Sequence, residues 1–322
     1  MIACGMIVAG FAQDSAKKLG TETSGGIAVQ RPTAKRIVFL GDSITHAGGY
    51  IARLEAGLRA KYPDYHPEII NLGLPSETVS GLSEPGHAGG QFPRPDLHER
   101  LGRILERTKP DLVVACYGMN CGMYYPLSEE RFEMFRSGIQ RLHDAVEKTG
   151  ARIIHLTPAY FDALPIRDRL LPEGLAEYRQ PFAKYDDVLE AYSQWLLSQH
   201  EKGWTVLDVH GAMKGAVAKA RETDPQFTLA SDGVHPNEAG QAIIAGPLAK
   251  LWGIELDGEG IPKHPRGKEL VQQIADKQNK LKLAWLTKTV HVRPGIPAGM
   301  TIEEATAEAK RIDEKVDALL KL

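Results

Sequence analysis

The sequence predicts an α/β protein, a three-layer α/β/α sandwich with a five-stranded parallel sheet and an added C-terminal helical extension. Five short apolar runs rich in β-branched residues alternate along the chain with longer segments that have a helical period. These runs are apolar on both faces, which is typical of strands in a parallel sheet that is covered on both sides. The crossovers that connect such strands are right-handed.

The first half of the chain supplies three strands and two helices. We expect, in order, strand 36–40, helix 50–62, strand 68–72, helix 96–108 and strand 111–116. The first helix stops before Pro63 and the second ends at the Lys109-Pro110 pair, because a proline disfavours helical backbone in the residue before it.

The second half continues the alternation. We expect helix 128–150, strand 152–156, helix 187–199, strand 205–209 and helix 237–252. The first of these helices starts at Ser128 with two acidic residues in its first turn, and Gly150 provides its stop. Residues 159–184 are Pro-rich and aromatic without a clear period, and a connection of this length is often functional.

The last 70 residues differ from the rest of the chain in composition and pattern. Residues 257–267 are rich in Gly and Pro, and helices are expected at 268–288 and 301–322. The final helix opens with a capping box of Thr301 and Glu304 and has an apolar stripe. We therefore predict a sheet domain over 34–252 and a helical extension over 253–322. This extension either packs against the sheet domain or provides a contact for a homo-oligomer.

Residues 1–33 are expected to form a signal-like, disordered segment outside the fold. Residues 1–12 are apolar and rich in small side chains, and a polar stretch follows, as at the cleavage site of a secretory signal. A positively charged start is missing, so an ordinary N-terminal tail is the alternative. Export to the periplasm or the exterior is favoured over a cytoplasmic location.

Composition excludes several classes of protein. The chain has 322 residues, 43% apolar residues and a formal net charge of −2, so it lacks the basic excess of nucleic-acid-binding domains. No apolar run reaches 18 residues, and a membrane-spanning helix is not expected. Three cysteines do not make a disulfide framework, and Cys116 and Cys121 are read as small buried side chains rather than a bridge.

Polar residues that require an explanation follow four of the predicted elements. They lie in Gly41-Asp42-Ser43-Ile44-Thr45, Asn71-Leu72-Gly73-Leu74, Gly118-Met119-Asn120 and Asp232-Gly233-Val234-His235-Pro236. Each segment alone is typical of a turn or a helix cap. Together they fall where an open α/β sheet binds its ligands, and they supply a nucleophile, a base, an orienting acid and oxyanion donors.

This series of motifs resembles the SGNH hydrolase (GDSL-like lipase/esterase) family. Ser43 lies in GDSIT, Gly73 in NLGL, Asn120 in GMN, and Asp232 and His235 in DGVHPN. The resemblance covers about residues 34–252 and implies a flavodoxin-like sheet. It also implies a flatter, more open site than in α/β-hydrolases, since no G-x-S-x-G elbow is present.

The chain departs from the family pattern at two positions. Cys121 follows the motif asparagine, where family members often have aspartate, and Pro75 lies near Gly73, where many have another glycine. Neither change removes a required atom, but both affect the shape of the pocket.

The residues suggest roles that do not depend on the family name. Ser43 is the nucleophile and His235 the base that removes its proton. Asp232 accepts the other ring N–H of His235 and fixes its tautomer. The oxyanion is expected to receive hydrogen bonds from the backbone N–H groups of Ser43 and Gly73 and from the Asn120 amide.

Four further residues are candidates for substrate contacts. They are Asp42, Arg94, Tyr124 and Tyr160. A solvated loop arginine is the alternative for Arg94, and core packing is the alternative for the two tyrosines.

A rival arrangement would use the same part of the chain as a metal site. It combines Asp42, His46, Asp208 and His210 with Asp232 and His235. The spacing matches no common ligand pattern, so we expect neither a metal nor an organic cofactor.

The expected function is hydrolysis of an O-acyl ester through an acyl-Ser43 intermediate. Predicted export, polar loops and the lack of a long apolar segment favour a carbohydrate O-acetylesterase that acts on a small-molecule or glycan ester. The alternatives are a lipase, lysophospholipase or thioesterase, an acyltransferase on the same site, and a non-catalytic carbohydrate-binding protein.

Overall fold

Five parallel strands form one sheet in the computed structural model, which describes residues 29–322. The strand order is β2-β1-β3-β4-β5, and every neighbouring pair is parallel. The strands are β1 (Arg36–Gly41), β2 (Glu68–Asn71), β3 (Leu112–Cys116), β4 (Arg152–Leu156) and β5 (Thr205–Leu207). The order reverses between β1 and β3, and the crevice at such a point is where sheets of this type bind ligands.

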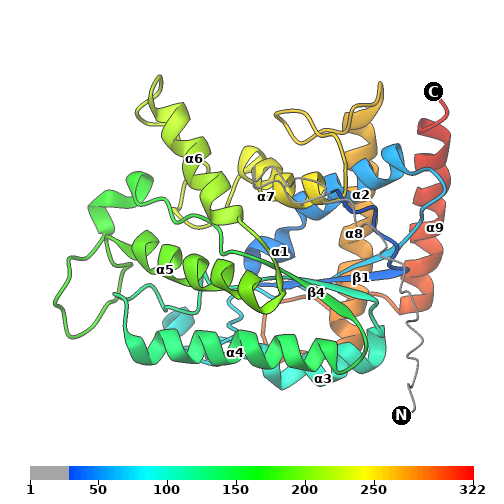
Figure 1. The fold of residues 1–322 in the computed structure, drawn as a ribbon. Coiled ribbons are helices and arrows are strands. Elements are labelled where there is room, and N and C mark those ends of the chain that lie inside the picture. The colour runs from blue at the N-terminus through cyan, green and yellow to red at the C-terminus, as the bar shows by residue number, and fades with distance from the viewer. Residues whose placement is uncertain (1–28) are drawn as a thin grey trace, which may run out of the picture.

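Helices cover both faces of this sheet, so the predicted three-layer sandwich is confirmed. In Figure 1, α2 and α7 lie on one face and α3 and α4 on the other. The α-helices are α1 (Ser43–Ala47), α2 (Gly49–Lys61), α3 (Leu97–Thr108), α4 (Glu129–Glu147), α5 (Tyr185–Ser198), α6 (Val209–Arg221), α7 (Glu238–Leu251), α8 (Gly267–Thr289) and α9 (Ile302–Leu319). Short 3₁₀ turns occur at His87–Gly90, Leu164–Arg169 and Gln199–Lys202.

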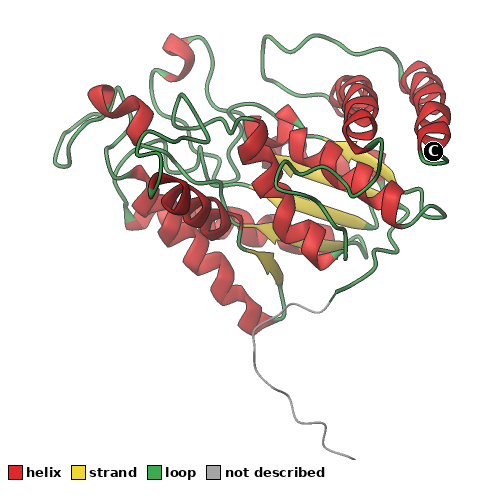
Figure 2. Ribbon diagram, turned by 90° about the horizontal axis from the view of Figure 1, so that it is seen from above, coloured by secondary structure: helices red, strands yellow, loops and turns green. Residues whose placement is uncertain are grey.

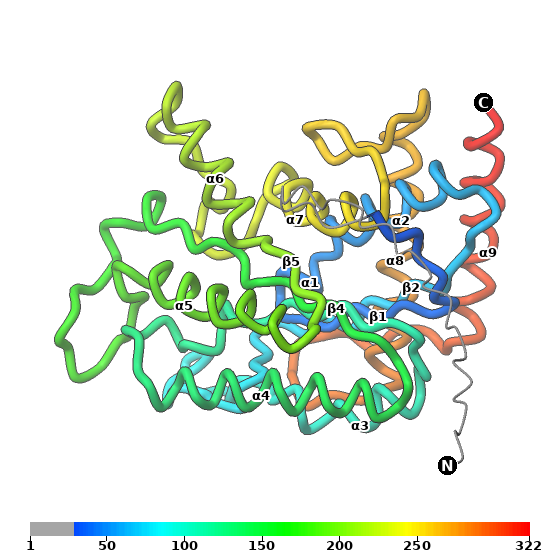
Figure 3. Tube along the Cα trace, viewed as in Figure 1, coloured from blue at the N-terminus to red at the C-terminus, as the bar shows by residue number. Residues whose placement is uncertain are grey.

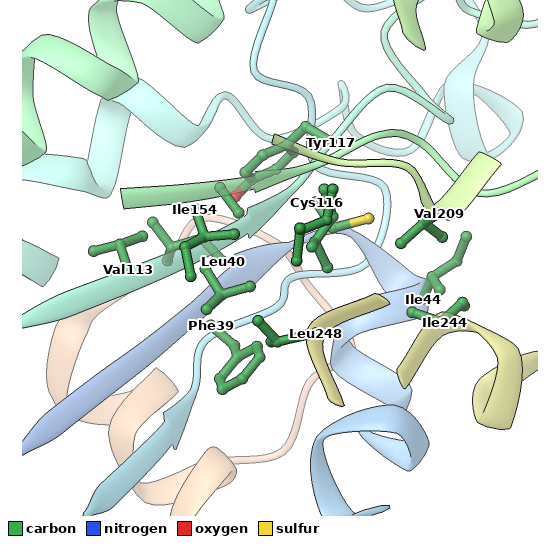
Figure 4. Packing of buried hydrophobic residues seen from close by; sticks show 14 of the residues in the cluster. Phe39, Leu40, Ile44, Val113, Cys116, Tyr117, Ile154, Val209, Ile244 and Leu248 are labelled. Atoms are coloured by element: carbon green, nitrogen blue, oxygen red, sulfur yellow. The ribbon is translucent and has the colours of Figure 1, made fainter. Parts of the chain in front are cut away.

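The main core lies between the strands and the helices that cover them. Phe39 and Leu40 of β1, Val113 of β3 and Ile154 of β4 are all buried. Figure 4 shows these side chains among residues of α1, α6 and α7, including Leu248. Strand β3 is buried throughout and β1 is buried from Ile37 onward, which explains why their sequences lack an alternating pattern.

The C-terminal helices pack on the sheet domain of the same chain. Helix α8 contacts the edge strand β2 as well as α2 and α3, and α9 packs along α8. Figure 2 shows the helix that ends at the C-terminus beside another helix at one side of the sheet. The predicted apolar stripe of α9 is buried at Ala305, Ala309, Ile312 and Val316, so it serves intramolecular packing.

No bounds were predicted from the sequence for two helices. α1 begins directly after β1, and α6 begins at Val209, within the strand that was expected over 205–209. Asp208 ends that strand because its side chain accepts a hydrogen bond from the Gly211 N–H and caps α6. Figure 3 shows α6 projecting from the body of the molecule.

Most of the signal-like segment 1–33, including Cys4, lies outside the described residues. Its last residues belong to the fold, because the Gln30 N–H donates to the Leu251 carbonyl (2.7 Å) and the Arg31 guanidinium lies over the Tyr62 ring. Within residues 29–322, no helix combines the length and apolar character needed to cross a bilayer. Cys116 and Cys121 are buried free thiols.

Candidate active site

Ser43 is the first residue of α1, immediately beyond the end of β1. Asp42 caps this short helix: its side chain accepts the Ile44 N–H (2.9 Å) and its carbonyl accepts the His46 N–H (2.9 Å). Only glycine fits at position 41, since a Cβ there would lie 2.1 Å from Thr45 Oγ1 and 2.7 Å from the Cys116 carbonyl. The Gly-Asp-Ser sequence therefore turns tightly from strand to helix and places Ser43 at the carboxyl edge of the sheet.

A hydrogen-bonded relay links Ser43 to His235 and Asp232. Ser43 Oγ lies 2.8 Å from His235 Nε2, and His235 Nδ1 lies 2.6 Å from Asp232 Oδ2. An ionised carboxylate only accepts hydrogen bonds, so the ring proton belongs on Nδ1. Nε2 is then free to accept the hydroxyl proton of Ser43, which is the arrangement needed for a general base.

The loop around Asp232 stabilises the ionised carboxylate. Asp232 Oδ1 accepts the backbone N–H groups of Val234 (2.9 Å) and His235 (2.8 Å). Partial burial opposes ionisation, but these bonds and the His235 ring hold the pKa of Asp232 below its usual range. The side chains of His235 and Asp232 are 54% and 49% exposed, so the relay is open to solvent and to a bulky substrate.

Asp162, a residue that the sequence did not single out, holds this loop in place. Its backbone N–H donates to the Gly233 carbonyl (2.9 Å). Its carboxylate, 1% exposed, accepts two bonds from Arg221 Nη2 (both 2.8 Å) and one from Thr228 Oγ1 (2.6 Å). The Arg221 and Thr228 partners are 59 and 66 positions away, so no local pattern reveals the contact.

The amide of Asn120 is oriented by its neighbours. Its Oδ1 accepts Arg94 Nη1 (2.9 Å) and the Tyr124 hydroxyl (3.2 Å), while its Nδ2 donates to the Glu77 carbonyl (3.2 Å). Because an arginine can only donate, these contacts fix which end of the amide is the NH₂. One Nδ2 hydrogen remains for another acceptor.

Arg94 is placed differently from the expected substrate contact. Its guanidinium is buried, and Glu84 accepts bonds from both Nε and Nη2 (2.7 Å each) while Nη1 reaches Asn120. This bidentate pair with Glu84 holds the pKa of Arg94 above its usual range despite burial. The structure thus gives Arg94 the task of orienting Asn120.

A second buried ion pair supports the loop after β2. Arg100 donates to both oxygens of Glu77 (2.6 and 2.7 Å) and to the Leu72 carbonyl (2.7 Å), and the Tyr117 hydroxyl also donates to Glu77 (2.7 Å). Burial raises the pKa of Glu77, although Arg100 opposes this. The loop that brings Glu77 to Asn120 is therefore anchored at both ends.

Gly73 does not offer its N–H to a ligand as the sequence predicted. That N–H donates to Asn71 Oδ1 (2.9 Å), and a Cβ at position 73 would lie 2.4 Å from the His46 nitrogen. The glycine is needed for close packing against α1. Three residues later, Ser76 has a left-handed backbone (φ 68°), and its N–H has no acceptor within residues 29–322.

The other predicted substrate contacts divide into two groups. Tyr124 is half-buried beside Asn120, with its ring under the Arg94 guanidinium. Tyr160 lies against His210, 6.2 Å between ring centroids, and its described contacts do not include the relay. Asp42 is only 3% exposed and acts as a cap; burial raises its pKa to about 6, against the opposing effects of the Ile44 N–H and His235.

The rival metal arrangement is not formed. His46 Nδ1 contacts the Gly73 carbonyl (2.9 Å), His210 Nε2 contacts Asp186 (3.0 Å), and Asp208 caps α6. Across residues 29–322, no three His, Cys, Asp or Glu side chains are grouped as ligands for a metal ion.

Comparison with known proteins gives one family and several similar folds. The family model described as GDSL-like Lipase/Acylhydrolase family matches residues 39–243. No curated protein matches the chain. Among solved structures, a gut microbial diltiazem-metabolizing enzyme is similar over 72% of this chain, with 19% identity and a TM-score of 0.57. The match covers 50% of that enzyme, so the chain spans about half its length.

An acetylxylan esterase from Geobacillus stearothermophilus, Axe2, is similar over 69% of this chain and 95% of its own, with 20% identity and a TM-score of 0.51. The matching structures of Axe2 include catalytic mutants in which a serine, an aspartate or a histidine is replaced by alanine. At 19% and 20% identity, these similarities show that this chain shares the fold of the two proteins.

Proposed function

The chain belongs to the GDSL-like lipase/acylhydrolase family and is a carboxylic ester hydrolase, and on this premise we propose that Ser43 attacks the ester as nucleophile, with His235 as its base and Asp232 as the orienting acid. The observation that carries the proposal is the continuous relay from Ser43 Oγ through both nitrogens of His235 to Asp232. In the esterase Axe2, the replaced catalytic aspartate and histidine are three positions apart, the same spacing as Asp232 and His235.

The reaction proceeds in two halves. Ser43 Oγ forms a bond to the ester carbonyl carbon while His235 Nε2 takes the hydroxyl proton. The tetrahedral intermediate collapses, the bond to the alcohol oxygen breaks, and His235 returns the proton to the leaving alcohol. A water molecule then repeats the sequence on acyl-Ser43 and releases the acid. The Asp232 carboxylate stabilises the imidazolium in both halves.

The negative oxygen of the intermediate is stabilised by N–H groups at the same edge. The Ser43 N–H lies in the first turn of α1, where helix geometry leaves it without an internal acceptor. The remaining Nδ2 hydrogen of Asn120 is a second donor. In place of Gly73 we assign the third to the Ser76 N–H, because the next residue, Glu77, is bonded to Asn120 through its carbonyl.

The preferred substrate is an O-acetylated carbohydrate. The half-exposed relay accommodates an ester on a large polar alcohol, and the fold is similar to that of an acetylxylan esterase. A lipase or thioesterase would instead require an apolar tunnel for a long acyl chain. An acyltransferase would pass the acyl group from Ser43 to a second alcohol rather than to water.

A panel of esters tests this proposal. Acetate release is measured from acetylated xylo-oligosaccharides, and p-nitrophenyl esters from acetate to longer chains are compared. We expect the highest kcat/KM with acetate, acetate release from the glycan, and loss of both activities in Ser43→Ala and His235→Ala with little change in Tm. Faster turnover of long-chain esters would contradict the acetylesterase proposal, and full activity of Ser43→Ala would contradict the mechanism.

A further inference from the structure

A cavity of about 700 Å³ opens beside the candidate active site. Residues 84–86, Tyr125 and residues 176–179 line it. These belong to three loops that follow the carboxyl ends of β2, β3 and β4, the edge of the sheet where Ser43 lies. Its volume is in the range of small-molecule sites.

The cavity is connected to Asn120 through the Arg94 guanidinium. Glu84, on the cavity wall, binds the Arg94 guanidinium, and Arg94 in turn donates to Asn120 Oδ1. The loop that carries lining residues 176–179 is also joined to the surroundings of Asn120. The Phe182 N–H, at the end of this loop, donates to the carbonyl of Tyr124 (2.9 Å), whose hydroxyl bonds Asn120. The lining includes neither Ser43 nor His235, so a molecule in the cavity is distinct from the ester that Ser43 attacks and is linked to Asn120 through Arg94.

Two tyrosine rings form an ordered wall. The rings of Tyr125 and Tyr178 are 5.4 Å apart at an angle of 41°. The Tyr178 hydroxyl donates to the Pro172 carbonyl (3.0 Å) and accepts the Leu175 N–H (3.3 Å), and the Arg131 guanidinium lies 5.4 Å from the Tyr125 ring centroid. Both rings are held in place by neighbours and are half-buried.

The polar groups around these rings are charged, and two of them face solvent. Glu177 and Arg179 are 76% and 89% exposed and lie 3.6 Å apart, and the Glu84 carboxylate completes the wall. A fatty acyl chain is a poor match, since Pro85 and Ala176 are the main aliphatic groups on the lining. A sugar ring has an apolar C–H face for an aromatic side chain and hydroxyl groups for carboxylates and a guanidinium.

We propose that this cavity is a subsite for a pyranose unit of the oligosaccharide chain that carries the ester, with Tyr178 as its main packing surface. The inference rests on the proposed function and deepens it. It predicts that the enzyme distinguishes an acetylated oligosaccharide from a small acetate ester by a contact remote from Ser43.

Kinetics of one variant on two substrates test the subsite. For Tyr178→Ala we expect the KM for acetylated xylo-oligosaccharides to rise about five- to tenfold, as loss of one aromatic contact implies. The kcat on this substrate and the kcat/KM with p-nitrophenyl acetate should not change. Tyr178→Phe keeps the ring but loses the two hydrogen bonds of its hydroxyl, so its oligosaccharide KM should rise less than that of Tyr178→Ala. Leu175→Ala changes the same loop outside the lining and should behave as the wild type.

An unchanged oligosaccharide KM in Tyr178→Ala would overturn the subsite, as would an equal loss on both substrates. Calorimetric titration with unacetylated xylotetraose separates this inference from the proposed function. Binding that Tyr178→Ala abolishes supports the subsite, even if the wild type releases no acetate and the esterase proposal fails. No binding of xylotetraose to the wild type would overturn the subsite and leave hydrolysis of small esters intact.

Discussion

Asp232 accepts three hydrogen bonds from its own loop, two from backbone N–H groups and one from the His235 ring. An amide at this position would point an NH₂ at Nδ1 and favour the wrong ring tautomer. We therefore expect Asp232→Asn to lower kcat by about 10²- to 10⁴-fold with a small effect on KM. Steady-state kinetics with p-nitrophenyl acetate measure this, and an unchanged kcat would remove Asp232 from the relay.

Replacing Asn120 tests its assignment as a donor to the oxyanion. Replacing it with alanine removes the Nδ2 donor, which matters most when the carbonyl oxygen becomes negative. We expect Asn120→Ala to lower kcat by about 100- to 1000-fold while KM changes little. A variant in which KM rises and kcat is kept would show that Asn120 binds the ground state instead.

Candidate site residues could be singled out from the sequence only where a motif contains them. Ser43, Asn120, Asp232 and His235 were singled out because their motifs follow one another in a specific order, and the structure places Ser43, His235 and Asp232 in one hydrogen-bonded relay. Gly73 was assigned wrongly, since its N–H is taken by Asn71, two residues earlier. The roles of Asp162 and Arg94 depend on partners 10 to 71 positions away, and only the folded chain brings these together.

At the scale of elements, a buried ion cluster joins α2 to the C-terminal helices. Lys277 of α8 donates to Glu55 of α2 and to Asp313 of α9 (2.8 Å to Asp313), and Gln278 also donates to Glu55. Lys277 and Glu55 are 5% and 2% exposed. The cluster fixes the orientation of residues that lie outside the family match.

Removing one member of this cluster should be costly. Lys277→Met leaves the Glu55 carboxylate buried without its cation, and we expect the free energy of unfolding to fall by about 3–5 kcal/mol in urea denaturation. Adding Glu55→Gln should recover part of the loss, because a neutral amide still bonds Gln278. A double variant less stable than the single one would show that the pairing with Lys277 is not the cause.

Element boundaries could be predicted where caps and prolines mark them. Helix α9 starts with the expected capping box of Thr301 and Glu304, and β4 has the predicted bounds. The starts of α1 and α6 show where such signals fail. α1 is only five residues long, and α6 begins with Val and His directly after an apolar strand, so the strand pattern hides its start.

At the scale of the whole molecule, the parallel sheet was predictable because its strands are apolar on both faces. The packing of α8 beside β2 was not, since an amphipathic helix shows which face is apolar but not what covers it. In the structure, α8 packs against α2 and β2, and Lys282 of α8 donates to the His46 carbonyl at the end of α1 (2.7 Å). The C-terminal extension thus supports the helix that carries Ser43.

Acid should weaken the fold through His155, a buried histidine of β4. Burial, together with the charge of His143, lowers the pKa of His155 to about 3 from its ordinary value of 6.5. As the pH falls below 6.5, the unfolded chain binds a proton on this histidine, whereas the folded chain does so only near pH 3. The contribution of the neutral ring to the free energy of unfolding is therefore complete above pH 6.5 and is lost as the pH falls towards 3.

We expect His155→Gln to reduce the loss of unfolding free energy between pH 7 and pH 5 by up to about 2 kcal/mol. Urea unfolding of wild type and variant at both pH values measures the difference, whatever the variant's absolute stability. Equal losses in the two proteins would contradict the role given to His155.

The most direct test of the account is covalent labelling by a fluorophosphonate probe, followed by mass spectrometry of the peptides. An activated serine hydroxyl displaces fluoride, so one adduct should form, on Ser43. Labelling should be absent in Ser43→Ala and about a hundredfold or more slower in His235→Ala, in which the base is missing. No adduct on Ser43 in folded protein, or labelling of His235→Ala at the wild-type rate, would contradict the claim that His235 activates Ser43.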